Sequence, residues 1–153
     1  MEILIRPAAI GDAGAMQVLN RDGLGYDYPI EKTKERLKTV LGNPEYKVFI
    51  AEADGRVIGY IHGADYHCTY TDPLKNILAL VVEERYRGQG AGKALITAIE
   101  QWARECGAAG VRLVSGYNRT GAHRFYETCG YHMRKEQKNF IKLFNTTEAG
   151  EKA

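Results

Sequence analysis

The residues best suited to chemistry form a basic, glycine-dense segment at positions 85–92, which reads RYRGQGAG. The segment directly follows the apolar run 77–82 and precedes an amphipathic stretch, which predicts a turn between a strand and a helix. Three glycines at alternate positions let the backbone approach a ligand without a Cβ in the way. The helix after the turn would direct its free N–H groups and the positive end of its dipole into it. We therefore predict a binding site for a pyrophosphate group.

Two common phosphate-binding loops do not fit this segment. A Walker-type loop has a serine or threonine after its Gly-Lys pair, whereas Ala94 follows Gly92 and Lys93, so the metal-binding hydroxyl is missing. A dinucleotide-binding loop has a different glycine spacing and lies near the start of a βαβ unit, whereas this segment lies in the middle of the chain.

The pattern that remains is Arg/Gln-x-x-Gly-x-Gly/Ala, which resembles the CoA-pyrophosphate motif of the GNAT superfamily of acyl-CoA N-acyltransferases. Residues 85–90 and residues 87–92 both match it, and the second register also aligns Leu95. The segment 125–131, which reads FYETCGY, resembles a second motif of the family, with Ala122 at the family's usual alanine position. The order of the predicted elements extends the resemblance from Ile3 to Phe144.

The expected fold is α/β (mixed α+β) and GNAT-like. It has a central mixed, mostly antiparallel twisted sheet with about four helices, and splayed parallel strands at the cofactor site. The pattern predicts helices at 13–20, 29–41, 91–106 and 120–128, and strands at 3–6, 46–53, 56–64, 75–83 and 111–115, with a final hairpin of 131–135 and 139–144. Asp54-Gly55 predicts a type I′ turn, and Asp12 is expected to cap the first helix. We expect one N-acetyltransferase domain over residues 1–144 and a disordered tail over 145–153.

The resemblance implies an enzyme that moves an acetyl group from acetyl-CoA to a primary amine by direct attack. The backbone of three strand residues would bind the acetyl carbonyl and the pantetheine arm: Leu80, Val81 and Val82. The backbone N–H groups of the loop would hold the pyrophosphate: Arg87, Gly88, Gln89, Gly90, Ala91 and Gly92. Tyr126 resembles the general acid that protonates the departing thiolate, although an aromatic residue on an amphipathic helix can also serve packing alone.

One position departs from the family pattern. Many members carry asparagine seven residues before the tyrosine, where this chain has Arg119, and Asn118 is displaced by one. Either Asn118 reaches CoA through a shifted turn, or Arg119 replaces it and contacts phosphate or the sheet edge. His123 lies four residues after Arg119, on the same helical face, and a structural hydrogen bond is its expected role.

Acetyl transfer also requires a base, because a cationic amine must lose a proton before it attacks. Glu83 directly follows the proposed acetyl-binding strand and is the first candidate, acting directly or through water, although a solvated turn carboxylate is an equal alternative. His62, Asp65 and His67 are further candidates near the end of the second hairpin strand.

The loop between the first two predicted helices is acidic and aromatic. Tyr26, Asp27 and Tyr28 are candidates to receive a cationic amine, which carboxylates and ring faces both attract. The alternative is a packed loop whose tyrosines cover the core. Polyamines, aminoglycosides, amino acids and protein N-termini all remain possible substrates.

Composition narrows the function classes further. A net charge of +2 over 153 residues gives no support for nucleic-acid or membrane binding driven by bulk charge. The three cysteines lie far apart and match no metal-binding spacing, so we expect no metal. With no visible secretory signal, we expect reduced thiols and a cytoplasmic location.

A homodimer is possible. A non-catalytic acyl-CoA-binding module or sensor, and a nucleotide-phosphate binder outside the family, are the competing hypotheses.

Overall fold

The computed structural model describes residues 1–145, and the chain divides into two compact units between Leu113 and Val114. The N-terminal unit contains β1 (Ile3–Pro7), η1 (Ile10–Asp12), α1 (Ala13–Leu19), η2 (Asn20–Leu24), α2 (Ile30–Leu41), β2 (Tyr46–Ala53), β3 (Arg56–Cys68), β4 (Thr71–Val82), η3 (Glu84–Tyr86), α3 (Ala91–Glu105) and β5 (Val111–Leu113). The C-terminal unit begins at Val114 and contains α4 (Thr120–Thr128).

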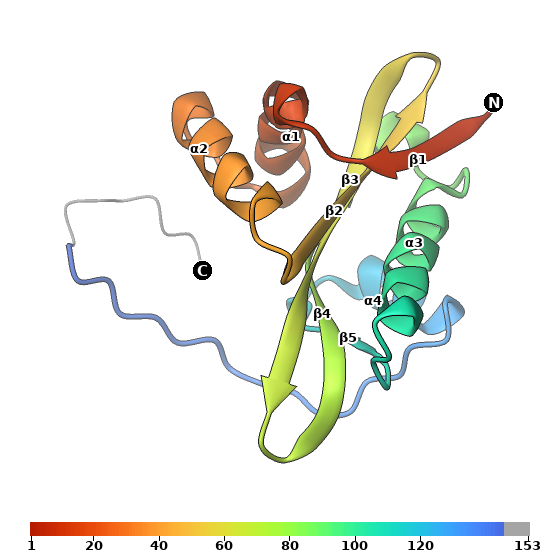
Figure 1. The fold of residues 1–153 in the computed structure, drawn as a ribbon. Helices are drawn as coiled ribbons and strands as arrows, with labels where there is room; N and C mark the ends of the chain where they lie inside the picture. Colours follow the sequence, from red (N-terminus) through yellow and green to blue (C-terminus); the bar gives the residue numbers. More distant parts are fainter. Residues whose placement is uncertain (146–153) are drawn as a thin grey trace. The chain divides into compact units, whose positions relative to one another are not determined.

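The sheet of the N-terminal unit has five strands in the order β1-β2-β3-β4-β5 (Figure 1). Neighbouring strands are antiparallel except β4 and β5, which are parallel and are connected through α3. Asp54 and Gly55 join β2 to β3 with φ angles of 54° and 77°, so the predicted type I′ turn is confirmed. The mixed, mostly antiparallel sheet with four α-helices agrees with the predicted fold class.

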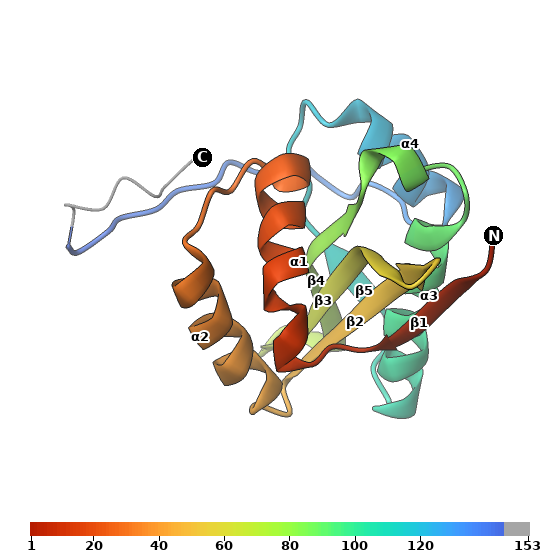
Figure 2. The ribbon, with the colours of Figure 1, turned by 90° about the horizontal axis from the view of Figure 1, so that it is seen from above.

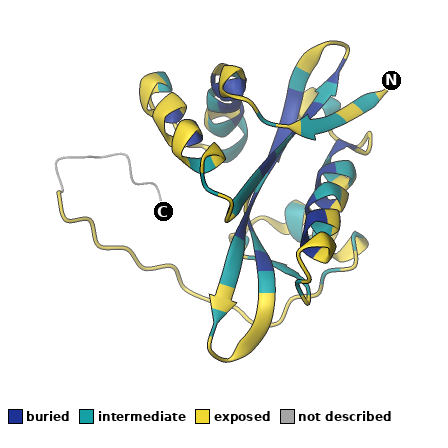
Figure 3. Cartoon of the chain, viewed as in Figure 1, coloured by how far each residue is buried: buried dark blue, intermediate teal, exposed yellow. Residues whose placement is uncertain are grey.

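Helices cover both faces of this sheet. Helices α1 and α2 lie on one face and α3 lies on the other (Figure 2), and we call these the α1/α2 face and the α3 face. Buried residues concentrate along the middle of the strands and on the inner sides of the helices (Figure 3). On the α3 face, a Cβ added at Gly63 would lie 2.8 Å from Ile99 and 3.1 Å from Trp102. Glycine at this position therefore lets α3 pack closely against β3.

Several local predictions were wrong. β3 and β4 continue beyond their expected ends, so residues 65–74 form a long hairpin rather than a loop. The Asp12 carboxylate gives no cap to α1, because it accepts hydrogen bonds from Arg6 and from the Ala9 N–H instead. Helix α3 ends at Glu105, one residue before its expected end, and Cys106 beyond it is exposed.

The predicted final hairpin is also absent, since residues 131–144 contain no strand. The described part of the C-terminal unit has no other strand against which a hairpin can pack, and an isolated two-stranded hairpin is at best marginally stable. The predicted disordered tail lies, from residue 146 onward, outside the described residues.

Candidate active site

The centre of the candidate site is the end of β4. β5 pairs with β4 only from Lys75 to Ile77, whereas β4 continues to Val82. Beyond Ile77, no strand of the described residues pairs with this edge, so its backbone groups are available to a ligand, apart from the Val82 carbonyl, which Arg87 binds. The side chains of Val81 and Val82 are buried and Leu80 is half-buried, so packing holds the open edge in place.

The turn after β4 is held against the strand by Arg87. Its Nε donates a hydrogen bond to the Val82 carbonyl at 2.9 Å, so this side chain supports the end of the strand. Gly88 and Gly90 have φ angles of 77° and 96°, a region that favours glycine. No heavy atom would lie within 4 Å of a Cβ added at either glycine. The turn therefore needs glycine for its backbone conformation, and the space beside it is open.

The start of α3 faces this turn with free donors. The Ala94 N–H bonds back to the Gly90 carbonyl, and no side chain caps the helix. The N–H groups of Ala91, Gly92 and Lys93 precede this first helical bond and have no partner within the helix. Three free N–H groups at a helix N-terminus, beside glycines with no Cβ, fit a pyrophosphate group.

Glu83 lies at the junction of the strand and the turn. Its backbone N–H bonds to the Ile58 carbonyl at 2.7 Å, which extends the pairing of β4 with β3. Its carboxylate accepts a hydrogen bond from Arg56 Nη2 at 2.8 Å and forms an ion pair with Arg85, whose Nε lies 3.0 Å from the other oxygen. Sequence reasoning missed Arg56, because it lies 27 residues away and only the strand pairing brings the two together.

The predicted substrate loop follows η2 and is hydrogen-bonded to both η2 and α1. The Tyr26 N–H bonds to the Asn20 carbonyl at 3.0 Å, and Gln17 donates to the Tyr28 carbonyl at 3.2 Å. Tyr26, Asp27 and Tyr28 are all exposed, so the tyrosines do not form part of the core.

The short helical turn η2, which leads into this loop, packs against the end of β4. A Cβ added at Gly23 would lie 2.4 Å from the Val81 side chain and 3.8 Å from Arg87 Nη2. The fold thus brings the segment before the loop to the strand end that carries the acetyl-binding candidates.

The histidine and aspartate candidates of β3 divide between the two faces of the sheet. His62 alternates with Tyr60, which lies in the core under α1 and α2, so His62 belongs to the α1/α2 face. Asp65 lies on the α3 face, where it pairs with Lys75. Burial lowers the pKa of His62 to about 4, and its buried Nε2 has no hydrogen-bond partner in the part of the chain that the structure describes.

The C-terminal unit carries the remaining candidates. The Arg119 N–H bonds to the Gly116 carbonyl at 3.0 Å, and Arg119 occupies the N-cap position of α4. His123 Nε2 lies 2.8 Å from the same carbonyl oxygen, in agreement with its predicted structural role. In the same unit, the oxygen of Asn118 would lie 3.3 Å from a Cβ added at Gly116.

Tyr126 lies on α4 among other aromatic rings. Its ring packs edge-on against Phe125 and Tyr131, with centroid distances of 5.4 and 6.2 Å. Burial raises the pKa of its hydroxyl, the charge of Arg119 opposes that shift, and Cys129 adds to it. The phenol is therefore protonated at neutral pH.

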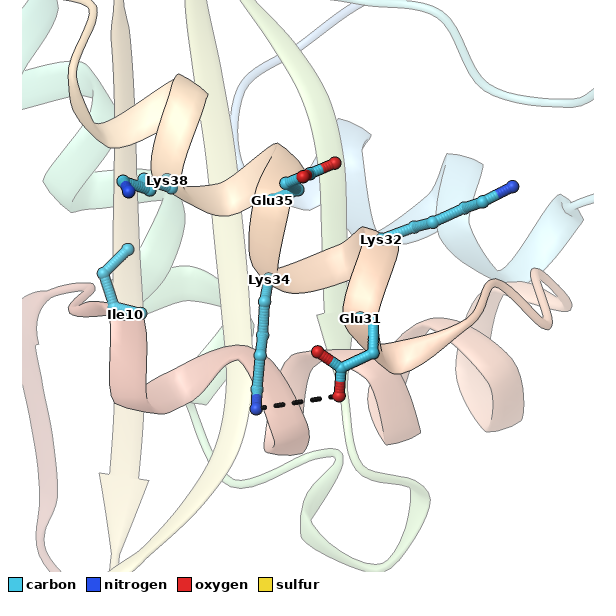
Figure 4. Close-up of a pocket in the computed structure, with 6 residues that line it drawn as sticks. All are labelled: Ile10, Glu31, Lys32, Lys34, Glu35 and Lys38. Carbon is cyan, nitrogen blue, oxygen red and sulfur yellow. Dashed lines mark ion pairs between the residues drawn. The ribbon is translucent and has the colours of Figure 1, made fainter.

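None of the site residues predicted from the sequence lines the surface hollow beside α2. It is lined by Ile10, Glu31, Lys32, Lys34, Glu35 and Lys38 (Figure 4). Lys34 and Glu31 form a 4.0 Å ion pair in which both side chains are more than half exposed. This hollow is the solvated charged side of α2.

Residues 1–145 contain neither a membrane-spanning helix nor a metal-binding group of side chains. No helix there is both long enough and apolar enough to cross a membrane. In the same residues, no group of three or more histidine, cysteine, aspartate or glutamate side chains is arranged to hold a metal ion.

Comparison with known proteins identifies the family. Residues 15–131 match the acetyltransferase (GNAT) family. The aminoglycoside N(6')-acetyltransferase type 1 of Stenotrophomonas maltophilia is 31% identical over 83% of this chain and 84% of its own length. The aminoalkylphosphonate N-acetyltransferase of Salmonella typhimurium is 28% identical over 83% of each chain.

Solved structures share the fold at lower identity. The aminoglycoside acetyltransferase AAC(6')-Iy, solved with a CoA bisubstrate analogue, superposes with a TM-score of 0.82 at 19% identity, over 94% of this chain and 99% of its own. The same enzyme has also been solved with CoA.

This chain therefore belongs to the acetyltransferase (GNAT) family, as its two motifs predicted. It is an N-acetyltransferase that uses acetyl-CoA to acetylate an amine.

Proposed function

We propose that the chain acetylates a primary amine of a small molecule by direct attack at the end of β4. One observation carries this proposal: β4 continues for five residues beyond its last pairing with β5, at Ile77, and ends at a turn that leads into the uncapped start of α3. An open strand edge beside free helix N–H groups suits a ligand that has both an acyl arm and a pyrophosphate.

The binding roles follow from this arrangement. Acetyl-CoA supplies the acetyl group as a thioester. The backbone of Leu80–Val82 holds the acyl arm, and the loop Arg87–Gly92 holds the pyrophosphate. The Arg87 backbone N–H is bonded to the Glu84 carbonyl at 3.2 Å and its Nε to the Val82 carbonyl, so Arg87 would contribute through its Nη groups. Asn118 and Arg119 remain alternative contacts for CoA, and their neighbouring positions before α4 support either one.

Tyr126 is proposed as the proton donor to the leaving thiolate. Its raised pKa supports this role, because a donor must carry its proton at the working pH. The CoA thiolate binds a proton less tightly than the Tyr126 phenolate does. The phenol must therefore contact the sulfur atom while the carbon–sulfur bond breaks. Protonation of the thiolate then prevents its return to the product.

Glu83 is proposed to accept the proton of the attacking amine through a water molecule. Arg56 and Arg85 occupy its two oxygens and hold the carboxylate in place, which favours an indirect route over direct contact. His62 is the second candidate. Its lowered pKa keeps it neutral, and its Nε2 has no partner among the described residues.

The substrate amine is proposed to enter beside Tyr26, Asp27 and Tyr28. Their exposure supports this, because a carboxylate and two ring faces attract an ammonium group. The two relatives described above are named for very different amines, an aminoglycoside and an aminoalkylphosphonate. Their names support a small-molecule amine as the substrate, with a peptide amine as the alternative.

We infer one functional domain over residues 1–144, since the family match at 15–131 spans both units. A cytoplasmic location stays a proposal, which rests on the sequence argument from the three widely spaced cysteines. Nucleic-acid and membrane partners have no support in the charge of the chain, and a homodimer remains a proposal.

The test combines binding with turnover. Calorimetry with acetyl-CoA is expected to show binding to the wild type, to Tyr126→Phe and to Glu83→Gln. Thiol release with a broad amine panel is expected to fall about 100-fold in Tyr126→Phe, within the usual range for loss of a general acid. An unchanged rate would remove Tyr126 from the mechanism. Binding without any amine-dependent thiol release would favour the non-catalytic sensor.

A further inference from the structure

A group of polar side chains lies on the α1/α2 face of the sheet, where β3, β4 and β5 run side by side. Ala64, Asn76 and Arg112 occupy paired positions across these strands, so their side chains share one face. Tyr66 follows Ala64 by two residues and belongs to the same face. We call Tyr66, Asn76 and Arg112 the β5 polar cluster.

Two neutral contacts fix the Arg112 guanidinium within this cluster. Arg112 Nη1 donates a hydrogen bond to the Asn76 side-chain oxygen at 2.7 Å. The guanidinium carbon lies 4.3 Å from the centre of the Tyr66 ring. These contacts do not use the Nε–Nη2 edge of the guanidinium. The two donors of such an edge can bind two oxygens of one anion. Arg112 Nε is buried and has no hydrogen-bond partner among residues 1–145.

The charge of Arg112 is also unpaired, since no ion pair found in residues 1–145 includes it. Other arginines of the N-terminal unit do contact carboxylates: Arg6, Arg21, Arg56 and Arg85. A half-buried guanidinium with a donor that lacks an acceptor is costly, and a bound oxyanion removes that cost.

The cluster lies close to the open edge of β4. Asn76 and Arg112 form the pair just before Ile77 and Leu113, which are the last residues paired between the two strands. Leu78, where the open edge begins, follows Asn76 by two residues, or roughly 7 Å at the rise of a strand. A molecule only a few bonds long spans the distance between the open edge and the guanidinium.

We propose that Arg112 binds an oxyanion on the acetyl acceptor, so that the substrate is a short amine with a carboxylate or phosphonate group. The inference rests on the proposed function, because it places the amine at the open edge of β4. Asn76 and Tyr66 hold the guanidinium in place, and its Nε–Nη2 edge faces the anion.

The test uses four amines with the same two-carbon spacing and different tails: β-alanine, 2-aminoethylphosphonate, ethanolamine and 1,2-diaminoethane. With the wild type, we expect kcat/KM at least about tenfold higher for one of the two acids than for ethanolamine, as a charged hydrogen-bonded pair provides. The two acids distinguish carboxylate from phosphonate. A wild type that prefers ethanolamine or the diamine would overturn this inference and leave the acetyltransferase proposal intact.

Arg112→Gln is the informative variant, because its amide can still donate to Asn76 while the charge and the two-donor edge are lost. We expect it to lose the preference for acids and to keep the wild-type rate with ethanolamine. Arg36→Ala removes an exposed arginine of α2 and serves as the matched control, with the acid preference unchanged. An equal loss with all four amines in Arg112→Gln would mean a structural role and would overturn the proposal.

A binding measurement covers the case in which none of these amines is acetylated. Calorimetry with propionate and with propylphosphonate, in saturating CoA, requires no turnover. We expect one of them to bind the wild type and to bind Arg112→Gln at least about tenfold more weakly. If neither anion binds the wild type, Arg112 is not an anion site, whatever the outcome of the acetyl-transfer test.

Discussion

Lys75 and Arg112 are cationic side chains on adjacent strands, and they lie on opposite faces of the sheet. Lys75 pairs with Asp65 on the α3 face, and its ammonium group stands 4.0 Å from the centre of the Trp102 ring. Its side chain is only 7% exposed. On the other face, the Arg112 guanidinium has two neutral partners, a hydrogen bond to the Asn76 amide and a cation-π contact with the Tyr66 ring.

The difference separates two uses of a partly buried charge. The protein itself supplies the counter-charge of Lys75, so removing one partner leaves the other unpaired and weakens the fold. The counter-charge of Arg112 is not supplied by any described residue, so its removal should affect a ligand more than the fold. The α3 face is therefore expected to determine stability, and the α1/α2 face is expected to determine substrate choice.

The largest expected effect is on the α3 face. Lys75→Ala removes the ammonium group that pairs with the Asp65 carboxylate and leaves His67, with its Nε2 at 3.7 Å, beside it. We expect the free energy of unfolding to fall by about 3 kcal/mol. Urea denaturation measures this loss. The double variant Lys75→Met with Asp65→Leu removes both charges and is expected to regain most of the stability. A loss below about 1 kcal/mol in Lys75→Ala would contradict the structural role given to this pair.

The second effect concerns His62 and depends on pH. Burial lowers the pKa of His62 from 6.5 to about 4, so between these values the unfolded chain binds a proton that the folded chain does not. The free energy of unfolding is therefore not reduced by His62 above about pH 6.5, and it decreases as the pH drops toward 4. We expect His62 to account for a loss of about 2 kcal/mol between pH 7 and pH 4.5.

His62→Gln tests this prediction, since glutamine does not titrate. Urea denaturation at pH 7 and pH 4.5 should show a smaller pH-dependent loss in the variant than in the wild type. The same loss in both proteins would assign the effect to other groups.

The third effect compares the two ends of α3. Gly90 and Gly107 both have positive φ angles, and no atom lies within 4 Å of a Cβ added at either. Alanine at either position should cost about 1 kcal/mol of stability through its backbone conformation. Only Gly90→Ala is expected to weaken acetyl-CoA binding, by about tenfold in calorimetry, because only Gly90 lies in the proposed pyrophosphate loop. Equal affinities in the two variants would argue against that loop.

The smallest expected effect is on the stability of the Arg112 face. Arg112→Gln keeps a donor for Asn76 and removes a charge that has no counter-charge, so we expect a change within about 0.5 kcal/mol. Urea denaturation measures it beside Lys75→Ala. A loss similar to that of Lys75→Ala would remove the distinction between the two faces.

Local patterns predicted the elements whose signals lie within a few residues. The type I′ turn at Asp54-Gly55 and α4 at residues 120–128 agree with the structure, because turn chemistry and helical periodicity are local. The extension of β3 and β4 through residues 65–74 was missed, because pairing between two polar strands depends on partners brought together by the hairpin. The prediction of a final hairpin was wrong for a related reason: among the described residues, its unit contains no neighbouring strand.

The sequence by itself determined the family and the glycine-rich turn of this N-acetyltransferase, because both rest on residue types at fixed short spacings. Only the tertiary structure brought Arg56 to Glu83, Lys75 to Asp65 and Arg112 to Asn76. These contacts join residues 10 to 36 positions apart. Strand register decides which of them meet and on which face they lie, and no local pattern records that register.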